Sequence, residues 1–194
     1  MLILAKERKN QIIRVAAKRF ARHGLGKTTL NEIARDVRIG KATIYHYFTS
    51  KEDLFYQTLE WEASQFIYDT KAIFNNEEIP LGGRLLEYFS YKETVATKYK
   101  LLFDLMLQLF ADDKFETERE ILKKLLKEEE KIVTLILSSV YSGRIESMDT
   151  ALPNYVTTVS WGLMFGKMLN NIAEPDRIVS MKDVMFKSLE NILN

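Results

Sequence analysis

Small, basic and hydroxyl-bearing side chains are concentrated in residues 38–51 of the chain. Lys41 and Lys51 can neutralise phosphate groups, and Thr43 is small enough to approach a phosphate or the edge of a base. Ala42 can contact a thymine methyl group. Donors for phosphate oxygens follow at Tyr45, His46 and Tyr47. Each residue alone fits an ordinary surface or core position, but the combination favours contact with double-stranded DNA.

The flanking residues predict the helices that would position this segment. Apolar residues recur at helical spacing at Ile13, Ala16, Ala17 and Phe20, and again at Leu30, Ile33, Ala34 and Val37. Gly24 is expected to end the first helix, and Thr29 and Glu32 have capping-box spacing at the start of the second. A third helix is expected over residues 41–48, after a short turn. Two short helices joined by a short turn form a helix-turn-helix, whose second helix enters the major groove.

Charge is distributed unevenly along the chain. The formal net charge is +1, yet residues 1–51 carry twelve Lys and Arg against three Asp and Glu, whereas residues 52–194 carry sixteen against twenty-four. A basic N-terminal segment joined to an acidic remainder predicts that the first segment binds a polyanion. A solvated basic face is the alternative.

Composition narrows the class of protein. The chain has 194 residues, of which 46% are hydrophobic and 28% charged, as in a folded globular protein. With no cysteine and two histidines, disulfides and thiolate zinc sites are excluded and a histidine-rich metal centre is not expected. No apolar run reaches the ~20 residues of a membrane span, and no signal peptide is recognised. We therefore expect a mostly helical, cytoplasmic protein without a metal or cofactor.

Residues 24–54 resemble the helix-turn-helix signature of the tetracycline-repressor (TetR) family of bacterial regulators. The matching positions are Gly24, Thr29, Ile33, Ala34, Lys41, Thr43, Tyr45, Phe48 and residues 51–54. The resemblance implies an all-α protein with a three-helix DNA-binding head, residues 1–50, and a helical ligand-binding and dimerisation body, residues 51–194. It also implies a homodimeric transcriptional regulator, expected to be a repressor, that binds an inverted-repeat operator and responds to a small-molecule effector.

The resemblance assigns DNA contacts by position. It places phosphates at Thr29 and Lys51, base edges at Lys41, Ala42 and Thr43, and further contacts at Asn31, Tyr45, His46 and Tyr47. Two more candidates, Arg38 and Gly40, depart from the family pattern. Arg38 stands where glycine is usual, so either this residue adopts a positive φ or the turn differs. Gly40 stands where Ser or Thr usually caps the third helix.

The remaining residues predict more helices, over about 51–74 behind a Thr49–Glu52 capping box, 117–140, 154–172 and 178–193. Candidate effector contacts are Trp61, Tyr88, Tyr91, Phe103, Met106, Phe110 and Tyr141. Candidate dimer contacts are Trp161, Phe165, Met168, Met185 and Leu189. Ordinary core packing is the alternative for both sets.

Enzyme chemistry has little support in the sequence. Gly26-Lys27-Thr28 imitates the end of a phosphate-binding loop, but Ala21 occupies the position of its first glycine. No nucleophile has a suitable partner, and the acidic run 128–130 is interpreted as a solvated helix face. Action at a membrane surface through the basic first helix is a further alternative. DNA binding is preferred because the apolar stripe of that helix is needed inside the head.

Overall fold

The computed structural model describes residues 2–111, 116–141, 151–172, 184 and 187. All the regular elements in these ranges are α-helices, which confirms the predicted all-α class. In chain order they are α1 (Leu2–Lys27), α2 (Leu30–Val37), α3 (Lys41–Tyr45), α4 (Lys51–Phe74), α5 (Leu81–Lys92), α6 (Val95–Lys98), α7 (Lys100–Ala111), α8 (Glu116–Tyr141) and α9 (Ala151–Ile172). Among the described helices, none combines the length and the apolar character that crossing a membrane requires.

The helices pack into two compact units. Unit one comprises residues 1–65 and 99–123 and therefore holds α1, α2, α3, α7, most of α4 and the start of α8. Unit two comprises residues 66–98 and 124–194 and holds the end of α4, α5, α6, the rest of α8, and α9. The predicted division at residue 50 concerns function, so these packing units do not test it.

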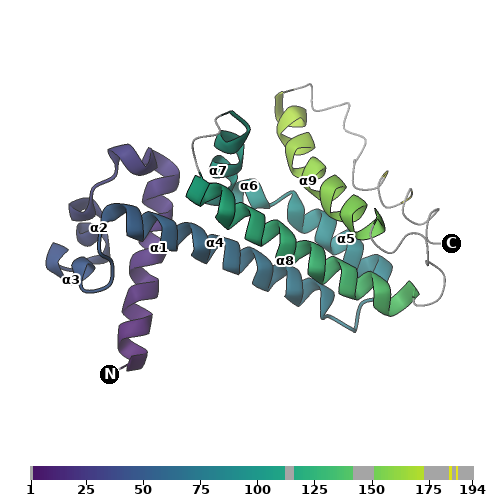
Figure 1. Cartoon of the computed structure of the whole chain (residues 1–194), viewed down its shortest axis with the longest axis horizontal. Coiled ribbons are helices and arrows are strands. Elements are labelled where there is room, and N and C mark those ends of the chain that lie inside the picture. Colours follow the sequence, from purple (N-terminus) through teal and green to yellow (C-terminus); the bar gives the residue numbers. More distant parts are fainter. Residues whose placement is uncertain (1, 112–115, 142–150, 173–183, 185–186, 188–194) are drawn as a thin grey trace. The chain divides into compact units, whose positions relative to one another are not determined.

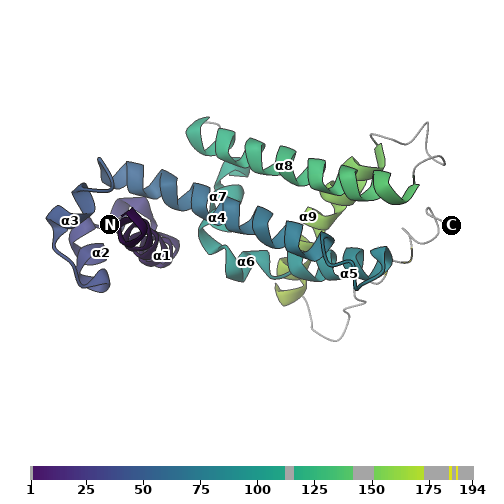
Figure 2. The same ribbon diagram turned by 90° about the horizontal axis from the view of Figure 1, so that it is seen from below.

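Unit one is built around the apolar stripe of α1. As the periodicity predicts, the stripe residues of both helices are buried where α1 packs against α2, namely Ile13, Ala16, Ala17, Phe20, Leu30, Ile33, Ala34 and Val37. Phe20 meets Phe55 of α4 edge to face, with 5.2 Å between ring centroids. Figure 1 shows α1, α2 and α3 together, and Figure 2 looks along α1 with α2 and α3 beside it. Because the stripe forms this core, it is not available to enter a membrane surface.

Both ends of α2 are fixed by local interactions. The Thr29 hydroxyl accepts the backbone N–H of Glu32 at 3.3 Å, and the Glu32 carboxylate accepts the N–H of Thr29 at 2.9 Å. This reciprocal pair confirms the predicted capping box. At the other end Arg38 adopts a left-handed conformation, with φ 60° and ψ 48°. Of the two alternatives for this turn, the positive φ at Arg38 is therefore the one observed.

Gly24 has a non-helical backbone, with φ 73° and ψ 170°, so the first helix is interrupted there as predicted, and one further turn of α1 follows to Lys27. Two other predicted boundaries in unit one differ from the structure. The helix α3 ends at Tyr45, and the chain then turns at residues 46–47. The cap of α4 is shifted by one residue from the predicted Thr49–Glu52 pair: Ser50 Oγ accepts the N–H of Asp53 at 2.9 Å. Because α4 begins at Lys51, Ser50 is the residue in the N-cap position.

Unit two has its own core, to which α4, α5, α8 and α9 contribute. Its buried members are Phe74, Leu85, Tyr88, Phe89, Ile132, Val133, Leu137, Leu152, Val156 and Leu163. The helix α9 begins at Ala151, three residues before the predicted start, because a proline such as Pro153 is tolerated in the first turn of a helix. The helix predicted over residues 178–193 lies almost entirely outside the described residues.

We expect Arg38→Gly to be more stable than Arg38→Ala. Both substitutions remove the same side chain, but only glycine adopts the left-handed conformation without a clash at Cβ, a difference of about 1 kcal/mol in the free energy of unfolding. Urea unfolding followed by circular dichroism measures it. Equal stability of the two variants would contradict a strained turn.

Candidate nucleic-acid interface and buried polar sites

All eleven predicted DNA-binding residues are at least partly exposed to solvent. Eight are exposed, namely Thr29, Asn31, Arg38, Gly40, Lys41, Ala42, Tyr45 and His46, and three are partly buried, namely Thr43, Tyr47 and Lys51. All of them lie in α2, in α3, beside these helices or at the first residue of α4, and all belong to unit one. The structure therefore brings this set together in the helix-turn-helix and leaves it accessible to a ligand.

Two apolar side chains anchor the segment that carries α3. Ile44 is 0% exposed and Phe48 is 1% exposed. Lys9 of α1 places its Nζ 5.5 Å from the centroid of the Phe48 ring. Tyr45, by contrast, is 50% exposed, which excludes the alternative in which its ring packs beneath the helix. The anchors thus turn α3 so that Tyr45 faces outward.

A shallow hollow of about 370 Å³ is lined by Thr29, Lys41, Tyr45, Lys51 and their neighbours. Lys41 Nζ lies 5.7 Å from the centroid of the Tyr45 ring. Lys51 Nζ donates a hydrogen bond of 2.8 Å to the carbonyl oxygen of Leu25, a contact that the sequence did not predict. This bond uses one of the three ammonium donors and joins the start of α4 to the end of α1. Lys51 therefore has a structural role in addition to its predicted phosphate contact.

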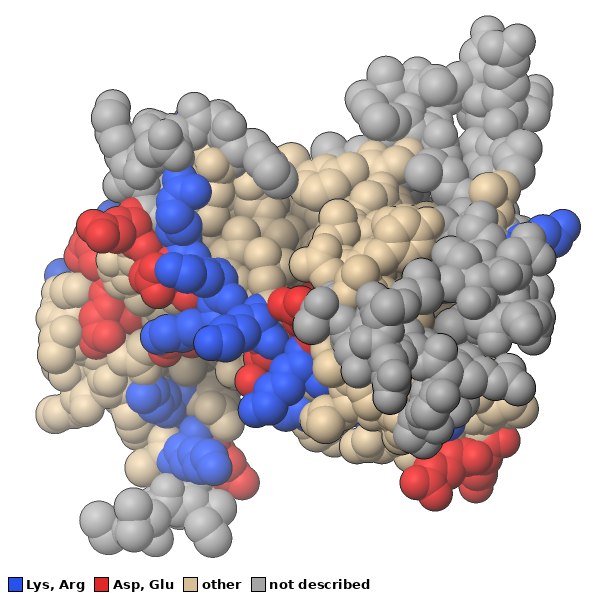
Figure 3. All heavy atoms as spheres, turned by 45° about the vertical axis from the view of Figure 1, so that its right-hand side comes forward, with Lys and Arg blue, Asp and Glu red and all other residues tan. Residues whose placement is uncertain are grey.

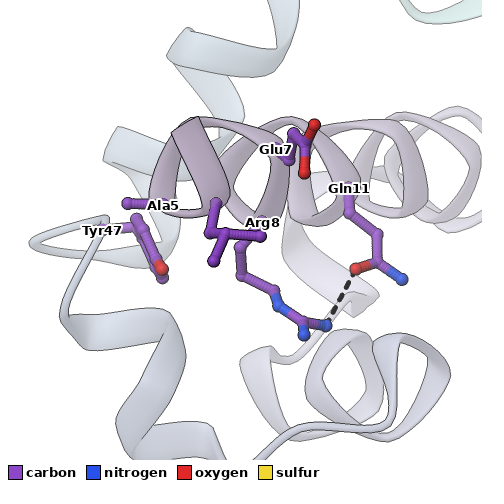
Figure 4. A pocket seen from close by; sticks show the side chains of 6 residues that line it. Ala5, Glu7, Arg8, Gln11 and Tyr47 are labelled. Carbon is purple, nitrogen blue, oxygen red and sulfur yellow. Dashed lines mark hydrogen bonds between the residues drawn. The ribbon is translucent and has the colours of Figure 1, made fainter. Parts of the chain in front are cut away.

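The Tyr47 side chain lies beside the first turns of α1. A second hollow, of about 490 Å³, is lined by Leu4, Ala5, Glu7, Arg8, Gln11 and Tyr47. Figure 4 shows the Tyr47 ring close to Ala5, and the Arg8 guanidinium donating to Gln11 at 2.9 Å. The first turns of α1, which sequence reasoning did not assign to the interface, thus bring a guanidinium to this side of Tyr47.

Charged hydrogen bonds orient α2 on α1. Arg19 Nε donates to Asp36 at 2.5 Å, and Arg19 Nη1 lies 3.3 Å from Glu32. The bond to Asp36 raises the pKa of Arg19, and the same bond lowers the pKa of Asp36. The Thr29 hydroxyl, by hydrogen bonding, lowers the pKa of Glu32. Because all these groups are near the surface, the network adds little stability and mainly fixes geometry.

The predicted effector contacts fall into two groups. Trp61, Phe103 and Met106 belong to unit one, where Trp61 is partly buried and the other two are buried. Tyr88 and Tyr91 belong to unit two, and both are buried. Phe110 is the last residue but one of α7 and Tyr141 is the last residue of α8, but their side chains lie outside the described residues. Membership of an effector site remains a prediction for all seven.

A buried carboxyl group that the sequence analysis did not select lies next to Trp61. Glu62 is 4% exposed and accepts the backbone N–H of Leu102, in the first turn of α7, at 2.8 Å. Burial raises the pKa of Glu62 to about 7, and the hydrogen bonds from the Leu102 and Leu101 backbone oppose this rise. The signal was its position, because Glu62 follows Leu59 by three residues on the buried face of α4.

A second buried carboxylate shows that the interpretation of residues 128–130 as a solvated face was wrong. Glu129 is 0% exposed. Its Oε1 accepts the Tyr88 hydroxyl at 2.7 Å and pairs with the Lys92 ammonium, and its Oε2 accepts the Trp161 indole N–H at 2.7 Å. The Tyr88 hydroxyl also lies 3.0 Å from Ser160 Oγ. Glu129 thus joins α5, α8 and α9.

This cluster changes the ionisation of its members. Burial raises the pKa of Tyr88 well above its usual value, and the nearby Glu129 charge acts in the same direction. Burial lowers the pKa of Lys92 to about 8, although Glu129 favours the charged ammonium. The stability of the Lys92–Glu129 ion pair therefore depends on the buried Lys92 amine keeping its proton.

Two predicted dimer contacts have described side chains. Trp161 is partly buried and donates its N–H to Glu129 of the same chain, and Phe165 is partly buried. The side chains of Met168, Met185 and Leu189 lie outside the described residues. The dimer interface accordingly remains a prediction.

The outer face of α8 carries a row of basic residues at four-residue spacing, namely Arg119, Lys123, Lys127 and Lys131. Figure 3 shows Lys and Arg side chains gathered in a band on one face of the molecule. In unit two, Lys124, Lys127 and Lys131 line a hollow together with Leu135, which is 64% exposed. The net negative charge of residues 52–194 is therefore an average over acidic and basic faces.

Comparison with known proteins places the helix-turn-helix in a family. Residues 12–58 match the family model of bacterial regulatory proteins, tetR family. Over 57 residues the chain is 40% identical to the HTH-type transcriptional regulator HbdR of Aromatoleum sp. (strain CIB), a match that covers 29% of this chain and 25% of HbdR. The matched region thus spans about a quarter of the length of that relative.

Two solved structures resemble nearly the whole chain. FadR from Bacillus subtilis, in complex with stearoyl-CoA, has a TM-score of 0.66 and 20% identity, covering 91% of this chain and 95% of FadR. A transcriptional regulator from Saccharomonospora viridis, in complex with choline, has a TM-score of 0.69 and 15% identity, covering 97% of this chain and 96% of that one. At these identities the likeness shows a shared fold.

Fold and site together define an all-helical protein with an N-terminal helix-turn-helix domain of the DNA-binding type. More particularly, residues 12–58 carry the DNA-binding domain of the TetR family of bacterial regulatory proteins. The resemblance drawn from the residues of the helix-turn-helix is confirmed.

We expect Glu62→Gln to stabilise the protein above pH 7 and to weaken its pH dependence. The pKa of Glu62 is about 7 when folded and near 4.5 when unfolded, so the native state binds the extra proton and stability falls as the pH rises between these values. At 1.36 kcal/mol per pKa unit, the gain at pH 8 is on the order of 3 kcal/mol. Urea unfolding at pH 5 and pH 8 measures it, with the exposed Glu60→Gln as the control. If the free energy of unfolding changes equally with pH in both variants, Glu62 is not the source of the pH dependence.

Proposed function

We propose that this chain is a DNA-binding transcriptional regulator, acting as a repressor, whose affinity for an inverted-repeat operator is modulated by a small-molecule effector. Two heads of a homodimer occupy successive major grooves, about 34–36 Å apart. Effector binding in the body favours an arrangement of the heads that no longer fits this spacing, which requires different effector affinities for the two arrangements.

The observation that carries the DNA-binding part is the accessibility of the assigned residues. Ile44 and Phe48 are buried as anchors, whereas Lys41, Ala42 and Tyr45 remain exposed on α3. A helix held in this way presents its polar face as a unit, as entry into a major groove requires. The family match of residues 12–58 supports the same assignment.

Fold neighbours support the effector part. FadR from Bacillus subtilis holds stearoyl-CoA, and the regulator from Saccharomonospora viridis holds choline. One ligand has a long acyl chain and the other is a small cation, so the shared fold does not fix the ligand class.

Selection from a random duplex-DNA library, at low and at physiological salt, tests the DNA-binding part. Recovery of an inverted repeat is the expected result. The opposite result is binding that enriches no sequence and vanishes at moderate salt. It would mean that the head contacts only phosphates, which contradicts an operator-reading regulator.

Lys51→Ala should weaken binding to about the same extent on all sequences. If Lys51 neutralises one phosphate, the slope of log affinity against log salt falls by about 1. The exposed Lys27→Ala serves as the control, because Lys27 is not among the residues assigned to DNA. A slope equal to that of the parent would remove Lys51 from the phosphate contacts and leave only its bond to Leu25.

Lys41→Ala and Thr43→Ala should instead change which bases are preferred. We assign both side chains to base edges, where losing a contact typically costs about 1–3 kcal/mol of discrimination at one position. Repeating the library selection with each variant measures the change. If both variants select the parent operator, α3 is not the helix that reads the bases.

A further inference from the structure

Unit two contains an aromatic cage around a buried ammonium group. Lys92 Nζ lies 3.4 Å from the ring centroid of Trp161, 4.6 Å from that of Phe66 and 5.3 Å from that of Tyr88. Lys92, Phe66, Tyr88 and Glu129 are each 0% exposed. Three ring faces and one carboxylate therefore surround a single positive charge, an arrangement that favours cations through the ring quadrupoles.

The present occupant fits the cage poorly. An ammonium group carries three N–H donors, yet among the described residues its one polar partner is Glu129, and its nitrogen lacks a well-formed hydrogen bond. The other walls are ring faces, which accept hydrogen bonds only weakly. A quaternary ammonium has no N–H donor to satisfy, so the same walls suit it better.

We propose that this cage is a binding site for a methylated ammonium ligand, which enters by displacing the Lys92 side chain. The ligand charge then faces Glu129 and the rings of Phe66, Tyr88 and Trp161. That such a ligand is the effector rests on the proposed function, whereas the site itself rests on the cage.

The structure offers a way for the exchange to occur. Trp161 is partly buried and is the cage member with solvent exposure, so its side of the cage is the nearest to water. Lys92 is the last residue of α5, and its flexible four-carbon stem can withdraw the ammonium by rotamer changes. Glu129 keeps its hydrogen bonds from Tyr88 and Trp161 throughout, so its carboxylate stays oriented toward the cage.

Competition with Lys92 makes ligand binding depend on pH. The titratable groups that face the ammonium are Glu129 and Tyr88, and α4 and α9 contribute Phe66, Ser160 and Trp161, which do not titrate in this range. Burial lowers the pKa of Lys92 to about 8, while the pKa of Tyr88 is raised well above 10, so Lys92 is the group that loses its proton between pH 7 and pH 9. Displacement into water returns the pKa of Lys92 to its ordinary 10.5, so ligand binding takes up a proton above pH 8 and weakens as the pH rises.

Titration of the whole chain with tetramethylammonium chloride tests the site. The chain has two tryptophans, so two indole N–H resonances are expected, and the one missing in Trp161→Phe is assigned to Trp161. We expect tetramethylammonium to shift this resonance saturably, whereas sodium chloride at equal ionic strength and the uncharged tert-butanol do not. If the Trp161 resonance does not shift, or shifts equally with either control, the proposed binding site is wrong.

The affinity, measured by calorimetry at pH 7 and pH 9, tests the displacement. It should decrease by up to about tenfold over this interval, because at pH 9 the caged Lys92 is mostly neutral, with a pKa of about 8, and must take up a proton when it is displaced into water, where its pKa returns to 10.5. An affinity that is constant or rises overturns competition with Lys92. This test needs no substitution in the cage and so does not depend on a variant folding.

Two variants sharpen the result. Lys92→Met removes the competing charge, so tetramethylammonium should bind at least tenfold more tightly at pH 7 and lose its pH dependence. If this variant unfolds because Glu129 is left unpaired, tetramethylammonium should restore its folding. The double variant Lys92→Met/Glu129→Gln has no buried carboxylate charge for a cation to balance. It should show neither tight binding of tetramethylammonium nor restored folding. Equal behaviour of the two variants overturns the proposal.

A separate assay distinguishes this site from the proposed function. If tetramethylammonium binds as expected but leaves the affinity for the selected operator unchanged, the cage is a cation site and the effector role fails. If the chain selects no operator at all while the indole resonance still shifts, the regulator proposal fails and the site stands.

Discussion

The buried charge of Glu129 constrains unit two more than any other single group described there. An ionised carboxylate cannot remain in a protein interior without a partner, so the helices around it must deliver donors to its two oxygens. α5 delivers Tyr88 and Lys92, and α9 delivers Trp161. Apolar packing tolerates small shifts, but hydrogen bonds from two helices to one carboxylate fix their relative rotation. The aromatic residues near it, assigned from sequence to effector or dimer contacts, owe their present orientation to this charge.

The elements of the head were predictable because local rules and global packing agree there. Apolar spacing gave the buried faces of α1 and α2, and the Thr29–Glu32 pair gave the start of α2. At Arg38 local preference and the turn disagree, because an L-residue rarely adopts a positive φ. In the structure Arg38 nevertheless has the positive φ that the turn requires. The Ser50 cap and the bond from Lys51 to Leu25 were missed. Both depend on which residue begins α4, and sequence patterns place a helix boundary only to within a few residues.

The buried charges were not predicted, although their positions carried a signal. Glu129 follows Leu125 by four residues and precedes Ile132 by three, so it lies on the buried stripe of α8. Lys92 follows Tyr88 by four residues on α5 in the same way. Composition alone assigns such residues to the solvent, because charged side chains are rarely buried unless paired. Their partners lie on other helices, 37 residues apart in the case of Lys92 and Glu129, and no local pattern shows that pairing. A charge on an apolar stripe is therefore better interpreted as half of an unseen pair.

The pairing also limits how unit two can respond to a ligand. Removing one partner of a buried ion pair typically costs about 3–5 kcal/mol, whereas coupling between an effector and a distant site is typically about 1–3 kcal/mol. An empty cage around Glu129 is thus too costly to be an intermediate state of regulation. What remains accessible is a choice between two filled states, one with the Lys92 ammonium and one with another cation. The two states share the carboxylate and the rings but differ in where the Lys92 stem lies at the end of α5. Regulation through this cage therefore requires that the displaced stem, and not the cation itself, change the packing of α5 against α9.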